Sequence, residues 1–210
     1  MPPLSTKERI LDAALELFSQ KGFDAVSVEQ IAQAVRIKAP SLYKHFPSKQ
    51  AIFETILAEM QRRYDARTAA MKLHFADADS DVQLFSDMDE TALIGKVQEL
   101  IRYALHDPYV SRSRRLLTIE QYRDPLLAQL YTERYMTHML VYHEKLFTRL
   151  VAAGVLRPFD PYLMAMQYVA PIYLLLSLCD RQPEKEPQAM DELAGHIRQF
   201  RTLYSPALSK

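Results

Sequence analysis

Apolar residues along this chain recur with the period of an α-helix, and no stretch of useful length alternates as a strand would. The clearest apolar stripe lies near the start, at Ile10, Ala13, Ala14, Leu17 and Phe18. Ser5 and Glu8 form a capping box before this stripe, and Gly22 follows it at a position suited to a left-handed backbone. The pattern predicts a helix between Ser5 and Gly22.

Two short helices and one long helix are predicted next. The first begins at Ser27, which has the residue type of a helix cap. Pro40 favours the first position of another helix, over roughly residues 40–45. Ser48 then caps a long helix that runs to about Lys72. Two short capped helices joined by a tight turn are typical of a helix-turn-helix.

The rest of the chain is predicted to be a helical body. Residues 77–90 are acidic and poorly periodic, and we expect a solvated linker there. Helices are expected beyond it, at about residues 90–106, 109–120, 124–153, 161–180 and 187–204. The predicted fold is therefore all-α, with an N-terminal three-helix head at residues 4–64 and a larger antiparallel helical body at residues 65–210.

One predicted helix, residues 161–179, is almost wholly apolar and nearly long enough to cross a bilayer. It contains Gln167, Pro171 and Ser177, and no basic cluster follows either end. We therefore expect a buried core helix or a dimer helix rather than a membrane span.

The distribution of charged residues points to a functional surface in one segment of the chain. The chain of 210 residues carries 26 Lys+Arg and 26 Asp+Glu, so it has no general basic coat for nucleic acid. Residues 36–49, however, contain no acid and four cationic side chains: Arg36, Lys38, Lys44 and Lys49. This local excess is the electrostatic footprint of a phosphate-facing surface. The lone cysteine, Cys179, allows no intrachain disulfide and fits a cytoplasmic protein.

The sequences SVEQIA at residues 27–32 and SLYKHFPSK at residues 41–49 resemble the TetR/AcrR family of bacterial transcriptional regulators. The resemblance is close over residues 4–64 and extends to the body in helix pattern and length. It implies a helix-turn-helix at residues 27–46 and a sequence-specific regulator of transcription. The function that it implies is a homodimeric, cytoplasmic repressor, released from a palindromic double-stranded operator by a small organic ligand.

The resemblance also implies roles for individual residues. The recognition helix would carry Lys38, Ala39, Pro40, Ser41, Tyr43, Lys44 and His45 into the major groove. Ser27 and Val28 would face a phosphate at a helix N-terminus, and Tyr43, Lys44 and Lys49 would bind backbone phosphate. Lys38, Ser41 and His45 would read bases, while Ala39 and Pro40 would contact thymine methyls. Leu42 and Phe46 share a face with Ile37 and are expected in the core.

Arg36 stands where this family usually has a turn glycine. A left-handed backbone costs a residue with a side chain about 1 kcal/mol or more. Either the turn differs slightly from the family pattern or its neighbours offset this strain.

The body is expected to supply a ligand pocket and a dimer interface. Polar-tipped rings are the candidates for ligand contact: Tyr103, His106, Tyr122, Tyr135, His138, Tyr142, Tyr168 and Tyr173. The resemblance places the dimer on the last two helices, with candidates Tyr162, Met166, Val169, Tyr173 and Leu176 beside Leu193, Ile197, Phe200 and Leu203 or Tyr204. A purely intrachain core remains the alternative to the dimer.

The sequence contains no sign of an enzyme. It has no glycine-rich phosphate loop, no nucleophile elbow and no paired-histidine metal signature, so no cofactor or metal is expected. Two alternatives remain open: a helix-turn-helix adaptor that binds proteins without ligand control, and a helical enzyme of unrecognised type.

Overall fold

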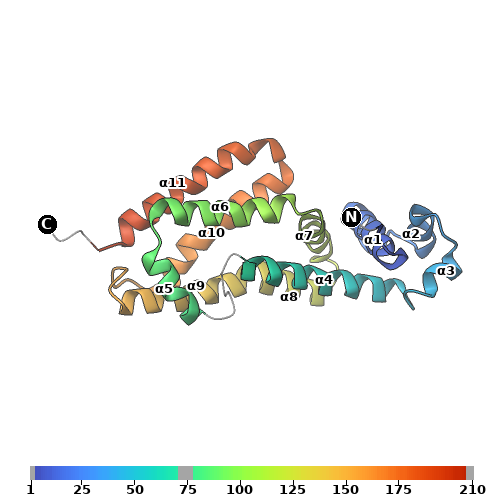
Figure 1. Ribbon diagram of the computed structural model, residues 1–210, viewed down its shortest axis with the longest axis horizontal. Coiled ribbons are helices and arrows are strands. Elements are labelled where there is room, and N and C mark those ends of the chain that lie inside the picture. Colours follow the sequence, from blue (N-terminus) through green and yellow to red (C-terminus); the bar gives the residue numbers. More distant parts are fainter. Residues whose placement is uncertain (1–2, 71–77, 207–210) are drawn as a thin grey trace. The chain divides into compact units, whose positions relative to one another are not determined.

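The structure is a computed structural model that describes residues 3–70 and 78–206. These residues form helices and no strand, which confirms the all-α prediction (Figure 1). The chain divides into two compact units. The first comprises Met1–Ala66 and His106–Tyr131, and the second comprises Arg67–Leu105 and Thr132–Lys210. The first division falls within two residues of the predicted head boundary, but residues 106–131, assigned to the body from sequence, pack with the head.

The first unit is built on a compact aromatic core. It contains α1 (Thr6–Lys21), α2 (Val28–Val35), α3 (Ala39–Tyr43), the first part of α4 (Lys49–Ala70), α7 (Pro108–Glu120) and most of α8 (Pro125–Thr132). The predicted capping box is present, with Ser5 Oγ accepting from the Glu8 N–H at 3.2 Å. Phe18, Phe23 and Phe53 pack against one another in tilted and edge-to-face arrangements, with ring centroids 4.9–6.2 Å apart.

Helix α7 joins this unit by packing across α1. Arg112 of α7 pairs with Asp12 at 3.0 Å and with Glu16 at 2.7 Å, and both acids lie on α1. The Tyr109 hydroxyl donates to the Ile56 carbonyl of α4 at 3.3 Å. These contacts explain why a segment remote in sequence belongs to the head.

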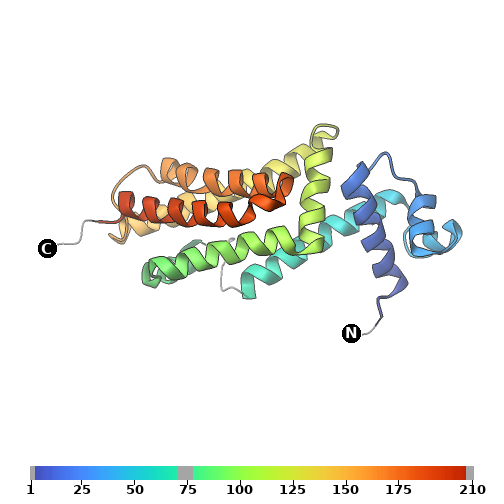
Figure 2. The same ribbon diagram turned by 90° about the horizontal axis from the view of Figure 1, so that it is seen from above.

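The second unit is a bundle around one hydrophobic core. It contains α5 (Ala78–Asp87), nearly all of α6 (Glu90–His106), η1 (Glu133–Thr137), α9 (His138–Ala152), α10 (Pro161–Arg181), η2 (Pro183–Lys185) and α11 (Glu186–Tyr204). Helices α10 and α11 lie side by side in both views, joined by the short η2 turn (Figures 1 and 2). Their inward faces meet α9 through Leu146, Phe147 and Ile197.

The predicted linker at residues 77–90 is wrong for most of its length, because residues 78–87 form α5. Asp81 is fully buried there and accepts a hydrogen bond from the Tyr142 hydroxyl of α9 at 2.6 Å. Asp79 pairs with Arg149 of the same helix at 2.6 Å. Asp79 and Asp81 are therefore partners of α9, which composition alone could not indicate. Residue 77 lies outside the described residues.

One predicted helix is not continuous in the structure. The predicted helix at residues 124–153 is interrupted by one turn of π-helix, Glu133–Thr137.

Helix α10 is the one helix in the described ranges that is long and apolar enough to cross a membrane. Core helices of soluble proteins also pass this test of length and composition. Only 33% of the most apolar 18-residue window of α10 is buried in the chain.

Candidate nucleic-acid interface

One side of helix α3 packs on the core of the first unit, and its other side is exposed to solvent. Lys38 precedes it in an extended conformation, with φ −83° and ψ 147°, and Pro40 stands in its first turn. Leu42 is fully buried and Phe46 is 3% exposed, so these two side chains hold the helix on the core. Both were expected in the core, and the structure confirms it.

The opposite face of α3 presents the predicted DNA-contacting residues to solvent. Tyr43 is 48% exposed, and Ala39 and Ser41 are half-buried at the edge of the face. The remaining members of this face are exposed: Lys38, Pro40, Lys44 and His45. These seven residues are thus exposed or half-buried around the buried Leu42, and we call them together the α3 face. An exposed aromatic hydroxyl between lysines is suited to phosphate and base-edge contacts.

The N-terminus of α2 lies in the same unit and has a complete capping box. Ser27 Oγ accepts from the Gln30 N–H at 3.3 Å, and Gln30 Oε1 accepts from the Ser27 N–H at 2.8 Å. The Val28 side chain is buried, at 9% exposure. Any contact that Val28 makes with a phosphate is therefore through its backbone N–H, where the helix dipole favours an anion.

The turn between α2 and α3 adopts the geometry that a glycine usually provides. Arg36 has φ 62° and ψ 43°, in the left-handed region. Its N–H donates to the Gln33 carbonyl at 3.0 Å, and the Ile37 N–H donates to the Ala32 carbonyl at 2.9 Å. These two bonds are a Schellman motif, which satisfies the last carbonyls of α2. The turn therefore has the left-handed geometry that a glycine usually provides, and its hydrogen bonds offset the strain at Arg36.

Lys49, which was predicted to bind phosphate, uses two of its three N–H donors within the first unit. Its Nζ donates to the carbonyls of Phe23 and Val26, each at 2.9 Å, and lies 4.2 Å from the centre of the Phe23 ring. The ammonium is thus engaged with the loop between α1 and α2. We therefore propose that the main role of Lys49 is to support that loop.

Glu120, which the sequence did not single out, supports the same loop from α7. Its Oε1 accepts from the Phe23 N–H at 2.8 Å, and the residue is 3% exposed. Gly22, with φ 82°, lies against this carboxylate, and a Cβ there would be 2.6 Å from Oε1. Because 97 residues separate Phe23 from Glu120, no local pattern could have indicated this contact.

The exposed charge near α3 is positive. Arg36, Lys38 and Lys44 are exposed, and none forms an ion pair with a described residue. Lys7 of α1 adds a fourth cation, with its Nζ 5.5 Å from the centre of the Phe46 ring. A chain without net charge therefore concentrates cations around one short helix.

The predicted ligand residues of the body do not converge on one site. The second unit has a cavity, and of the eight candidates only Tyr168 lines it. Tyr122 is wrong as a pocket residue, because it belongs to the first unit and is 88% exposed. Tyr142 is bonded to Asp81, and Tyr103 stacks under Arg67 at 5.2 Å. The others lie outside the cavity lining: His106, Tyr135, His138 and Tyr173.

The predicted dimer residues fall into three groups by their exposure. Five of them are at most 9% exposed within their own chain and are corrected to core positions: Val169, Leu176, Leu193, Ile197 and Phe200. Tyr173 and Tyr204 are half-buried. Tyr162, Met166 and Leu203 are 40–52% exposed, and Leu163 and Leu174, which were not named from sequence, are 52% and 65% exposed. The apolar period of α10 did not distinguish its inward side from its outward side.

The head matches known regulators by sequence. Residues 10–56 match the family of bacterial regulatory proteins called the tetR family. Over 48 residues the chain is 50% identical to the biofilm operon icaADBC HTH-type negative transcriptional regulator IcaR of Staphylococcus aureus (strain Newman), covering 23% of this chain and 26% of IcaR. Over 74 residues it is 39% identical to the HTH-type transcriptional regulator UidR of Escherichia coli K12, covering 34% of this chain and 38% of UidR. The matches thus span well under half of these relatives.

The whole chain matches known regulators by fold. A TetR-family transcriptional regulator from Mesorhizobium loti superposes with a TM-score of 0.66 at 22% identity, over 96% of this chain and 97% of that one. SmeT of Stenotrophomonas maltophilia, the repressor of the SmeDEF multidrug efflux pump, gives 0.64 at 18% identity, over 97% and 92%. Residues 10–56 thus match the tetR family of bacterial regulatory proteins, and the chain as a whole shares the fold of solved TetR-family regulators.

Proposed function

We propose that this protein is a sequence-specific transcriptional repressor that binds a palindromic operator as a homodimer and leaves it when a small organic ligand binds the body. The observation that carries the proposal is the α3 face, which is cationic and exposed while Leu42 and Phe46 fix the helix beneath it. The negative regulator IcaR, which matches the head at 50% identity, supports the direction of control. In this proposal the protein acts in the cytoplasm and is not an enzyme.

On DNA, some residues of the α3 face would bind phosphates and position the head, and others would read the base sequence. Tyr43, Lys44 and the N-terminus of α2 at Ser27 would bind phosphates and fix the register of the head. Lys38, Ser41 and His45 would read base edges, with Ala39 and Pro40 against thymine methyls. Arg36 extends the cationic surface at the turn.

A single head has few contacts to offer, and a palindrome doubles them. The exposed apolar side chains of the last two helices support a second copy as the partner. Leu174 is 65% exposed, and Leu163 and Leu203 are each 52% exposed. Exposed apolar residues gathered on neighbouring helices are typical of an interface between copies. Tyr162 and Met166 belong to the same proposed interface.

Ligand control is supported by the cavity of the second unit. SmeT, which shares the fold, has been solved in complex with triclosan. A ligand releases the operator only if it binds one head spacing better than the other. Release would follow when the recognition helices no longer match successive major grooves.

Selection of bound duplexes from a random DNA pool tests the proposal. We expect enrichment of a two-fold symmetric sequence whose half-sites lie about one helical turn, 10 base pairs, apart. The variant Leu42→Lys, which disrupts the support of α3, should enrich nothing, and circular dichroism would check that its helices remain. Enrichment of no sequence by the native chain would instead favour the helix-turn-helix adaptor.

A further inference from the structure

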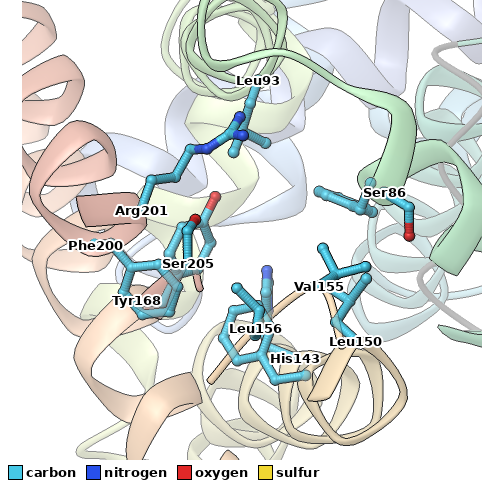
Figure 3. Close-up of a pocket in the computed structure, with 12 residues that line it drawn as sticks. Ser86, Leu93, His143, Leu150, Val155, Leu156, Tyr168, Phe200, Arg201 and Ser205 are labelled. Carbon is cyan, nitrogen blue, oxygen red and sulfur yellow. The ribbon is translucent and has the colours of Figure 1, made fainter. Parts of the chain in front are cut away.

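The cavity of the second unit lies within the hydrophobic core and has a volume of about 90 Å³. Side chains from α5, α6, α9, α10 and α11 form it (Figure 3). Half of its apolar lining is aromatic, Phe85, Phe147, Tyr168 and Phe200, and half is aliphatic, Leu93, Leu150, Val155 and Leu156. The rings of Phe147 and Phe200 have centroids 5.3 Å apart, and Tyr168 stands 5.6 Å from Phe147 in an edge-on arrangement. Such a lining favours a ligand with a flat, apolar ring.

His143 contributes a hydrogen-bond acceptor to this aromatic space. Its Nδ1 lies 2.8 Å from the Met139 carbonyl, and a carbonyl can only accept, so Nδ1 carries the proton. Burial lowers the pKa of His143 to about 4, which leaves the ring neutral and Nε2 without a proton near pH 7. No described residue donates to Nε2. Figure 3 shows the His143 side chain rising from α9 toward the cavity.

Tyr168 adds a hydroxyl group that also has no hydrogen-bond partner among the described residues. The residue is 5% exposed, and its side chain makes ring contacts but no hydrogen bond with any described residue. Burial raises the pKa of Tyr168, so the hydroxyl keeps its proton and can both donate and accept. The Tyr168 hydroxyl and His143 Nε2 thus supply two hydrogen-bonding groups to one cavity, which suits an occupant that carries polar groups.

Arg201 of α11 places a positive charge at the edge of the cavity. One of its N–H groups donates to the Met88 carbonyl at 3.2 Å. No carboxylate of the described residues lies within ion-pair distance of its guanidinium. Four N–H donors of the guanidinium are therefore left over, and a carboxylate is the group whose geometry matches them.

We propose that this cavity binds a small aromatic carboxylate that also carries a hydroxyl group, such as a hydroxybenzoate. The ring lies against Phe147 and Phe200, the hydroxyl donates to His143 Nε2 and the carboxylate pairs with Arg201. The inference rests on the proposed function, because the compound would be the ligand that releases the operator. A cavity of about 150 Å³ encloses one benzene, so this smaller cavity holds only part of the ring, and the rest of the compound extends toward the open side.

Isothermal titration of the full chain with three matched probes tests the chemistry. The probes are 4-hydroxybenzoate, 4-methoxybenzoate, which has no hydroxyl donor, and 4-methylphenol, which has no carboxylate. We expect 4-hydroxybenzoate to bind with a Kd of about 1 mM or tighter, and each of the others at least about tenfold more weakly. Binding of all three probes with equal affinity, or of none, would overturn the proposal.

Two variants and one control locate the binding. His143→Phe keeps an aromatic ring but removes the acceptor, and it should abolish the preference for 4-hydroxybenzoate over its methyl ether. Arg201→Met should abolish the preference for 4-hydroxybenzoate over 4-methylphenol. Arg198→Met, on the exposed face of the same helix, should bind like the native chain. If His143→Phe does not fold by circular dichroism, Arg201→Met decides alone, and an unchanged preference in it contradicts the assignment.

These titrations contain no DNA, so they fail or succeed independently of the proposed function. Binding of 4-hydroxybenzoate by a chain that selects no DNA sequence would support the cavity assignment and refute the repressor. Selection of a palindrome by a chain that binds none of the probes would support the repressor and refute the cavity assignment.

Discussion

Arg36 shows how a single side chain can oppose the backbone that its turn requires. Its left-handed conformation, φ 62°, costs an ordinary residue about 1 kcal/mol or more, and the Schellman hydrogen bonds offset that cost without removing it. We therefore predict that Arg36→Gly raises the free energy of unfolding by about 1 kcal/mol, measured by urea denaturation. Arg36→Ala removes the same charge but keeps the strain, so it should bring no such gain. Equal stability of the two variants would show that the turn is unstrained.

His143 makes stability depend on pH in a stated direction. Its folded-state pKa is lowered to about 4, whereas an unfolded histidine has 6.5. The unfolded state therefore binds more protons between these values, and the free energy of unfolding falls as the pH drops through this window. Between pH 7 and pH 5 we expect His143 to account for a loss of up to about 2 kcal/mol.

The comparison of His143→Gln with the native chain checks this prediction. Urea midpoints at pH 7 and pH 5 should differ less in His143→Gln than in the native chain. His45→Gln, at an exposed position, should behave like the native chain. An identical pH response in all three chains would mean that His143 is not buried as the neutral form.

At the scale of elements, local signals predicted what local forces determine. The capping boxes at Ser5 and Ser27 and the proline of α3 set helix starts through contacts within three residues, and the structure has each of them. Helix α5 was missed because the force that forms it is not local. Asp81 is buried through a bond to Tyr142, 61 residues away, and acidic composition alone indicated solvent.

The same distinction holds for the candidate site. The buried side of α3 could be predicted because Leu42 and Phe46 share a helical face with Ile37, whereas the DNA-contacting residues were implied by the family resemblance. The contacts of Lys49 could not be predicted, because its partners Phe23 and Val26 are more than 20 residues away in the sequence. An exposed lysine and a lysine that caps carbonyls look identical in sequence.

The loop between α1 and α2 provides a test of the role proposed for Lys49. Lys49→Met leaves the carbonyls of Phe23 and Val26 without their donor, and we predict a loss of about 1–3 kcal/mol in the free energy of unfolding. Lys44→Met removes an exposed lysine of the α3 face and should leave stability within about 0.5 kcal/mol of the native chain. Thermal or urea denaturation without DNA measures both. A stable Lys49→Met with weakened DNA binding would restore the phosphate role.

For the whole molecule, the account requires two copies. The outer side of α10 exposes apolar surface that the chain itself does not cover. We predict that Leu174→Glu shifts the protein from dimer toward monomer in sedimentation velocity at micromolar concentration, because a carboxylate would be buried without a partner. Leu126→Glu, at a 74% exposed position of α8, should remain dimeric. A dimeric Leu174→Glu would place the interface elsewhere.

The central claim is that the α3 face binds duplex DNA, and the salt dependence of binding to the selected duplex tests it most directly. Fluorescence anisotropy across a salt series gives the slope of log K against log salt concentration, which reports phosphate contacts. With two copies on the duplex, Lys44→Ala should lower the magnitude of the slope by about two. Lys145→Ala, exposed on α9, should leave it unchanged. An unchanged slope for Lys44→Ala would contradict the account.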